Sequence, residues 1–159
     1  MNRRNVLGLS ALTALGIGLL PGNPVAQQAA DMDGVKAASK AFYDALAVLD
    51  DGTAMAKVWA QKPYITYVSP SSTSVMVGWD AQKKSWPENN ARYSKRSVAL
   101  SDSQIHVNGN LAWEIGVETG QTQTKDGTIR PIDAIATNVY EKIDGRWLMV
   151  SHHAGAKPK

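Results

Sequence analysis

The chain has no cysteine and only one phenylalanine among its 159 residues. Without cysteine, no disulfide framework can support the fold and no thiolate can bind a metal. A strong excess of one charge is missing too: 17 Lys and Arg face 14 Asp and Glu, and two of the 17 are Arg3 and Arg4. The later basic clusters are short and not interleaved with aromatic residues, which argues against nucleic-acid binding.

The N-terminal segment has the order of an export signal. Arg3 and Arg4 precede an apolar run from Val6 to Leu20, a Pro-Gly break and small residues suited to cleavage. We expect residues 1–26 to be removed, with cuts after Ala29 or Ala30 as alternatives, and residues 27–159 to form one domain. The run is shorter than the roughly 20 residues that a membrane span needs, so we expect no stable membrane anchor after cleavage.

The two adjacent arginines favour the twin-arginine route over an ordinary secretory signal. Either route predicts a periplasmic or secreted protein.

Helical patterns come first in the remaining chain. Apolar residues from Val35 to Leu49 recur at three- and four-residue spacing, which predicts a helix from about Asp33 to Gly52. A short second helix is expected at 53–59, strands at 64–68 and 74–77, and a helix at 79–86 limited by Pro87. Beyond Pro87 the chain is predicted to be sheet.

Two hairpins are expected near the C-terminus. A three-residue loop at 108–110 would pair Val107 with Leu111 and Ile105 with Trp113. With that register, Glu114 and Glu118 would point to solvent or an interface. The Asp144-Gly145 turn would pair Tyr140 with Met149 and Thr137 with His152. Both faces of the second hairpin are apolar, so we expect a homodimer to cover one of them.

This element order, together with "LDDG", "VGWDAQKKSW" and "EKIDGRWLMVSHH", resembles the nuclear transport factor 2-like superfamily and its SnoaL-like group. The resemblance covers residues 33–155. It implies an α+β, cone-shaped fold in which a strongly curved antiparallel sheet is wrapped by about three N-terminal helices. A pocket is then expected between sheet and helices.

The superfamily includes enzymes and noncatalytic binding or assembly domains, so the fold does not decide the function. The general-base carboxylate of ketosteroid isomerase aligns with Ser69, and its oxyanion-stabilising acid aligns with Thr137. Neither residue supplies a carboxyl group, which argues against isomerase activity and leaves open whether the chain is an enzyme.

Three residues are the candidates for catalysis: Asp133, His152 and His153. Adjacent strand residues point to opposite faces, so the two histidines cannot share one ion or substrate unless a bulge intervenes, and we expect no metal site and no cofactor. A pair of Asp133 with His152 or His153 would act as a general base. The alternatives are histidines hydrogen-bonded in a sheet or interface, and an exposed Asp133 held by Arg130 or by solvent.

Aromatic residues supply the expected pocket walls. The predicted ligand-binding residues are Tyr43, Trp59, Tyr67, Trp86, Trp113 and Thr137, with core packing as the alternative role for Trp113. We therefore expect an exported domain that binds a small, largely apolar molecule, with or without acid/base chemistry of isomerase, cyclase or dehydratase type. The alternative is a noncatalytic dimeric assembly or accessory module.

Overall fold

The computed structural model describes residues 24–158. Its elements are the helices α1 (Pro24–Ala47) and α2 (Trp79–Ala91), the single 3-10 turn η1 (Met55–Lys57), and the strands β1 (Thr66–Val68), β2 (Met76–Val77), β3 (Tyr93–Asn108), β4 (Leu111–Thr124), β5 (Ile129–Ile143) and β6 (Arg146–Ala156). The predicted export signal at 1–26 lies almost entirely outside the described residues and stays a prediction. No helix of the described part is long and apolar enough to cross a membrane.

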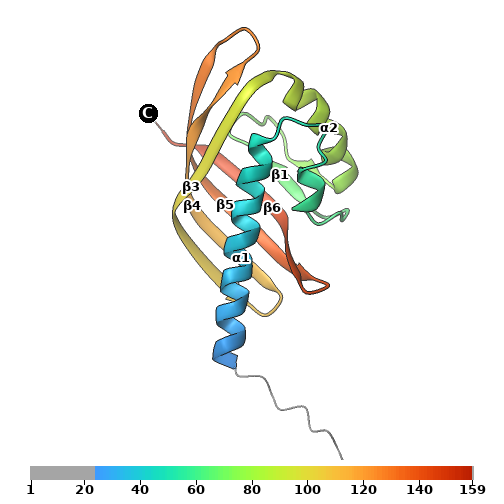
Figure 1. Cartoon of the computed structure of the whole chain (residues 1–159), viewed down its shortest axis with the longest axis vertical. Coiled ribbons are helices and arrows are strands. Elements are labelled where there is room, and N and C mark those ends of the chain that lie inside the picture. The colour runs from blue at the N-terminus through green and yellow to red at the C-terminus, as the bar shows by residue number, and fades with distance from the viewer. Residues whose placement is uncertain (1–23, 159) are drawn as a thin grey trace, which may run out of the picture.

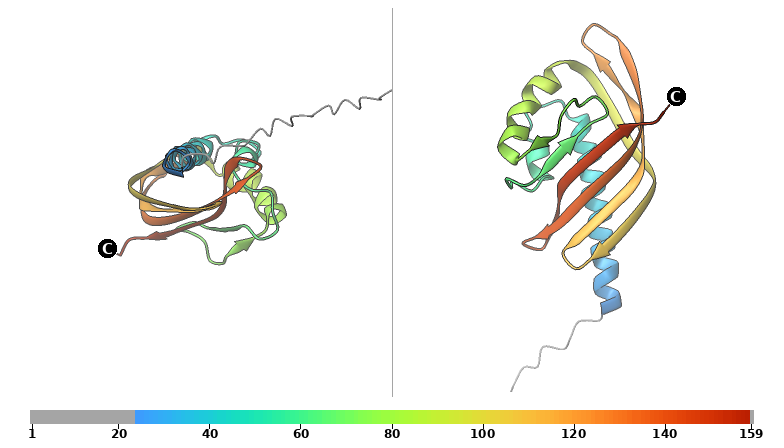
Figure 2. Two further views of the ribbon diagram at one scale, coloured as in Figure 1. Left: turned by 90° about the horizontal axis from the view of Figure 1, so that it is seen from below. Right: turned by 180° about the vertical axis from the view of Figure 1, so that it is seen from behind.

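The six strands form one curved sheet in the order β2-β1-β6-β5-β4-β3. All neighbouring pairs are antiparallel except β1 and β6, which run parallel. Helix α1 lies across the concave face, while α2, β1 and β2 close one end (Figures 1 and 2). The expected α+β cone, with a curved sheet wrapped by helices, is confirmed.

Helix α1 begins earlier and ends earlier than expected. Its first turn starts at Pro24, which suits a helix start because proline needs no N–H partner there. Its end precedes Asp50, whose carboxylate accepts hydrogen bonds from the backbone N–H groups of Gly52 and Ala54 at 2.8 and 2.9 Å. These side-chain bonds offer the backbone a turn in place of another helical turn.

Helix α2 continues past Pro87, which was expected to limit it. Proline removes one backbone hydrogen bond from a helix interior. Here Pro87 lies on the exposed side, four residues before the last residue of the helix, so water can pair the freed carbonyl. The cost is small enough for the buried face of Trp79, Gln82 and Trp86 to hold the helix in place.

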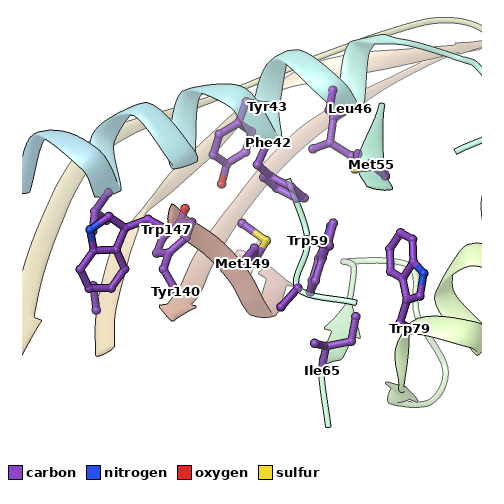
Figure 3. Packing of buried hydrophobic residues seen from close by; sticks show 14 of the residues in the cluster. Phe42, Tyr43, Leu46, Met55, Trp59, Ile65, Trp79, Tyr140, Trp147 and Met149 are labelled. Atoms are coloured by element: carbon purple, nitrogen blue, oxygen red, sulfur yellow. The ribbon is translucent and has the colours of Figure 1, made fainter. Parts of the chain in front are cut away.

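The core lies between α1 and the concave face of the sheet (Figure 3). Phe42 and Leu46 of α1 pack there with Trp59, Tyr140 and Met149. The N-terminal half of α1 is tied to the β5–β6 hairpin through Asp31. Its Oδ1 accepts from Lys142 Nζ at 2.6 Å and from Trp147 Nε1 at 3.3 Å. These two bonds hold the N-terminal half of α1 against the hairpin.

Candidate functional site

Six buried polar side chains from four elements form one connected group, which we call the inner polar cluster. They come from α1, β4, β5 and β6, and they are Tyr43, Glu114, Glu118, Asn138, Tyr140 and His152. Each is at most 8% exposed. Polar groups at this depth are stable only when they are hydrogen-bonded, and the cluster supplies those bonds from within.

Tyr43 links the helix to the sheet. Its hydroxyl donates to Glu118 Oε1 at 2.9 Å and accepts from Asn138 Nδ2 at 3.1 Å. Figure 3 shows the Tyr43 ring reaching down from α1 with its hydroxyl directed toward the sheet. Burial, followed by the charge of Glu118, raises the pKa of the Tyr43 phenol far above its usual range, so this hydroxyl keeps its proton.

Glu114 occupies the other half of the cluster. Its Oε2 accepts from the Tyr140 hydroxyl at 3.0 Å and from Asn138 Nδ2 at 3.4 Å. Among the described residues, no donor hydrogen-bonds to its second oxygen, Oε1. One carboxylate oxygen therefore remains available to another group.

His152 closes the cluster from β6. Its Nδ1 lies 2.7 Å from Asn138 Oδ1, and because that oxygen only accepts, Nδ1 carries the proton. Nε2 then has a lone pair and lies 3.8 Å from Glu118 Oε1. Burial first, and the neighbouring His153 second, lower the pKa of His152 to about 3. The imidazole is therefore neutral at ordinary pH.

Glu118 has the opposite shift. Burial raises the pKa of its carboxyl group, and the bond from Tyr43 only partly offsets the rise. A protonated Glu118 would also avoid placing a charged oxygen against the lone pair of His152 Nε2. Burial thus favours the neutral form of Glu118 more than water would, at a position next to the Tyr43 hydroxyl.

A cavity of about 690 Å³ lies between α1 and β3 and reaches this cluster. Tyr43, Ser39 and Glu114 line its buried end, and Val98, Leu100 and Ile105 form apolar walls. The remaining lining residues come from α1 and β3 and are Met32, Lys36, Lys40, Asp44, Ala47, Ser97, Ala99 and Ser103. The cavity therefore combines an apolar wall with a polar, acidic inner end.

Aromatic rings pack around the far side of His152. Tyr67 stacks on the imidazole with ring centroids 5.3 Å apart, and Trp86 and Trp59 lie edge-on to Tyr67 at 5.6 and 6.2 Å. Burial, as the largest cause, raises the pKa of Tyr67 to about 12. The predicted convergence of Trp59, Tyr67 and Trp86 is therefore present, but these rings pack against one another and do not line the α1–β3 cavity.

The other predicted site residues lie on the outer face of the sheet. Asp133 is exposed and pairs with Lys157 at 2.7 Å rather than with a histidine or Arg130. His153 is exposed opposite Thr137, and Trp113 stacks on His106 with ring centroids 5.2 Å apart. The expected Asp133–His152 pair is not formed, and Trp113 and Thr137 do not face the cavity.

A bulge in the last hairpin explains the position of His152. Tyr140 pairs with Met149 as predicted, but the register then shifts and Val139 pairs with Ser151. The extra residue, Val150, turns His152 to the concave face beside Asn138. A one-residue change of register moves every later side chain to the other face.

The first hairpin has a shorter turn than expected. Asn108 pairs with Leu111 and His106 with Trp113, so Ile105 faces Glu114. This register turns Glu114 and Glu118 inward, and their expected solvent-facing position is wrong. The sequence did carry a signal for them. Two glutamates alternate with apolar residues on β4, and the neighbouring strand β5 places Asn138 directly opposite Glu114.

Within residues 24–158, no group of three or more His, Asp or Glu side chains is placed to hold a metal ion.

Comparison with known proteins places residues 35–156 on the family model described as a SnoaL-like domain. No curated protein matches the chain in sequence. A candidate dehydratase of the NTF2-like family from Streptomyces avermitilis has a similar structure, with a TM-score of 0.73 and 22% identity over 82% of this chain and 99% of that chain.

Two further solved structures share the fold. An NTF2-like superfamily protein from Salmonella enterica has a TM-score of 0.70 at 18% identity, covering 86% of this chain and 95% of that chain. The association domain of C. elegans CaMKII has a TM-score of 0.64 at 17% identity, covering 82% of this chain and 98% of that chain. At these identities the likeness concerns the fold.

Proposed function

The chain belongs to the SnoaL-like domain family, and from that premise we propose that it binds a small, largely apolar molecule between α1 and β3 and performs acid/base chemistry on it. The observation that carries this proposal is the meeting of Tyr43 and Glu114, both buried and both hydrogen-bonded to Asn138, at the inner end of a 690 Å³ cavity. Cavities of this size hold small organic ligands. The apolar side chains of Val98, Leu100 and Ile105 favour a largely apolar one.

Tyr43 is the proposed general acid. When Glu118 is protonated, its O–H donates to the Tyr43 oxygen, and the Tyr43 proton turns toward the cavity. Tyr43 then gives its proton to the ligand while the Glu118 proton moves to the Tyr43 oxygen. The products are a protonated ligand, a neutral Tyr43 and a Glu118 carboxylate. Burial raises the pKa of Glu118, which favours keeping a proton on this group for delivery.

Glu114 is the proposed general base. Its Oε1 is the carboxylate oxygen that no described residue binds, and the side chain lines the cavity. Tyr140 and Asn138 hold the other oxygen and so fix the orientation of the carboxylate. An acid and a base at one end of a cavity suit an elimination or isomerisation, in which one proton is removed and another is delivered.

Blocking the cavity tests the proposal. Leu100 lies on the cavity wall, and Leu100→Trp would fill part of the space, whereas Ile115→Trp adds the same ring on the outer face, where Ile115 is 43% exposed. We expect small apolar compounds that raise the Tm of the protein to lose this effect in Leu100→Trp and to keep it in Ile115→Trp. Equal binding by both variants, each confirmed as folded, would place the ligand elsewhere.

The second candidate function is assembly as a homodimer. The outer face of the sheet exposes Leu111, Ile115 and Ile135, at 46%, 43% and 54% exposure, next to Trp113. Exposed apolar patches of this kind mark interaction surfaces. Sedimentation at micromolar concentration should give a dimer, and Ile135→Lys should give a folded monomer. A monomer without the substitution would remove this candidate.

We also infer that the protein acts outside the cytoplasm, in the periplasm or the medium. This inference is supported only by Arg3, Arg4 and the apolar run from Val6 to Leu20. Replacing both arginines by lysine should retain the protein in the cytoplasmic fraction if the twin-arginine route is used. Unchanged export would favour the ordinary secretory route, and a cytoplasmic unsubstituted protein would contradict the inference.

A further inference from the structure

Glu114 lines the inner end of the cavity, and Glu118 hydrogen-bonds the Tyr43 side chain that lies beside it there. Glu114 and Glu118 lie two positions either side of Gly116 on the same face of β4, and each is only 3% exposed. Neither forms an ion pair with a lysine or arginine of residues 24–158. Buried charges are normally paired, so this arrangement calls for an explanation.

His152, the basic side chain beside Glu118, does not supply a positive charge to pair with the two glutamates. The lowered pKa of His152, about 3, keeps its imidazole neutral. Among the described residues, no group of three or more His, Asp or Glu side chains is placed to hold a metal ion. The two lysines that line the cavity, Lys36 and Lys40, do not reach either glutamate.

Those lysines lie at the cavity mouth in contact with water. The side chains of Lys36 and Lys40 are 61% and 77% exposed, and each is paired with an aspartate of α1, at 3.5 and 2.6 Å. Exposed ion pairs are screened by solvent, so their effect on a buried ligand group is weak. The charge at the inner end therefore decides which ligand group is favoured there.

Glu118 and Glu114 differ in their access to a ligand. Glu118 does not line the cavity; it accepts a hydrogen bond from Tyr43, and burial raises its pKa and so favours its neutral form. Glu114 lines the cavity directly and has a free Oε1. The Tyr43 ring lies beside it in the cavity wall, and aromatic rings attract cations.

We propose that the cavity selects an organic amine, a small and otherwise apolar molecule whose protonated nitrogen binds the Glu114 carboxylate. The inference rests on the proposed ligand site between α1 and β3. An ammonium group would donate a charge-assisted hydrogen bond to Oε1, which is stronger than a neutral one. The remaining carbon skeleton would contact Val98, Leu100 and Ile105.

Three probes that share a phenyl ring and a two-carbon linker and differ in the polar group separate charge from shape: 2-phenylethylamine, 2-phenylethanol and 3-phenylpropanoate. Isothermal titration of the full protein at pH 7 should give a Kd for the amine about tenfold or more below that of the alcohol, as expected for one charge-assisted bond. The carboxylate probe should bind more weakly than the alcohol. This comparison requires no substitution, so it does not depend on a variant folding.

Glu114→Gln tests the named residue. The amide keeps the size of the side chain and removes its charge, so the amine should lose its advantage and bind within about threefold of the alcohol, while the alcohol is unchanged. Asp133→Asn, which removes an exposed carboxylate on the outer face of the sheet, is the control and should keep the preference for the amine.

The outcomes are distinguishable. If the alcohol binds as tightly as the amine, and Leu100→Trp abolishes both, the site stands and the preference for amines is overturned. If Glu114→Gln keeps the full preference, Glu114 is not the recognition group and the inference is overturned. If none of the three probes binds, both the inference and the proposed ligand site between α1 and β3 are contradicted.

Discussion

The Tyr43 hydroxyl donates to Glu118 Oε1 at 2.9 Å and thereby joins helix α1 to strand β4 in the interior of the cone. The two residues are 75 positions apart in the chain. Because Asn138 also donates to the Tyr43 oxygen, this one hydroxyl holds together a helix and two strands. The bond contributes both to stability and to the proposed proton transfer.

Tyr43→Phe should therefore destabilise the protein. The substitution removes the donor to a buried carboxyl group and the acceptor for Asn138, and leaving such groups unpaired costs about 1–3 kcal/mol. Urea unfolding followed by circular dichroism measures the change. Tyr64→Phe is the control, since Tyr64 is 52% exposed and bonds Glu141 at the surface, and it should change stability by less than about 0.5 kcal/mol. Equal effects of the two substitutions would show that the Tyr43 bond contributes no more than a surface bond.

His152 should make the protein sensitive to acid. Its pKa is lowered from 6.5 to about 3 in the folded state, so the unfolded chain binds a proton over this range and the folded chain does not. Stability should fall as the pH decreases from 6.5 toward 3, by up to about 1.4 kcal/mol per pH unit from this group. His152→Gln should flatten the slope between pH 6.5 and 4, and His106→Gln, on the exposed outer face, should leave it unchanged. A slope that persists in His152→Gln would assign the acid sensitivity to other groups.

Glu118 should act in the opposite direction. Burial raises its folded-state pKa above 4.5, so its contribution to stability is present at low pH and is lost as the pH rises from about 4.5 through the raised value. Glu118→Gln keeps a neutral, hydrogen-bonding side chain and should remove this loss. The unfolding free energy of the variant, relative to the unsubstituted protein, should therefore increase with pH across that window. A constant difference would indicate that the Glu118 pKa is the same in the folded and unfolded states.

The two corrections to the expected site have one physical origin. The hairpin turn lies at Asp144-Gly145, where the sequence predicts it, and Tyr140 pairs with Met149 as predicted. The bulge at Val150 and the shorter turn before Leu111 each move the chain by one residue. With a side-chain period of two, these shifts turn His152 and Glu114 inward and leave Trp113 and Thr137 outside. Turn length and bulges depend on packing across the whole sheet, which a local pattern does not contain.

The helical and aromatic parts were more predictable. Phe42 and Leu46 follow the helical spacing and both reach the core, because a single apolar stripe suffices to place a helix face. Tyr43 was predicted to be a ligand-binding residue, and it lines the cavity. The contact between Tyr43 and Glu118 could not be predicted. It depends on how α1 crosses the sheet and on a strand register that differs by one residue from the expected one.

Gly116→Ala should damage the wall of the cavity. A Cβ atom at this position would lie 2.8 Å from the Ser101 backbone oxygen and 2.9 Å from Leu100 Cγ. Both contacts are shorter than side chains tolerate, so β3 would have to shift, at a cost of about 1–3 kcal/mol. Chemical denaturation measures this loss. Gly155→Ala, where a Cβ would meet no atom within 4 Å, should stay within about 0.5 kcal/mol of the unsubstituted protein. A neutral Gly116→Ala would mean that the spacing of β3 and β4 is less fixed than the contacts indicate.

The most direct test of the proposed site is the position of a bound ligand in a crystal of the protein soaked with whichever of the three phenyl probes binds most tightly. We predict density between α1 and β3, with the polar group of the probe within hydrogen-bond distance of Glu114 or Tyr43 and its ring against Leu100. A probe found only on the outer face of the sheet, beside Asp133 or His153, would contradict the assignment of this cavity as the functional site.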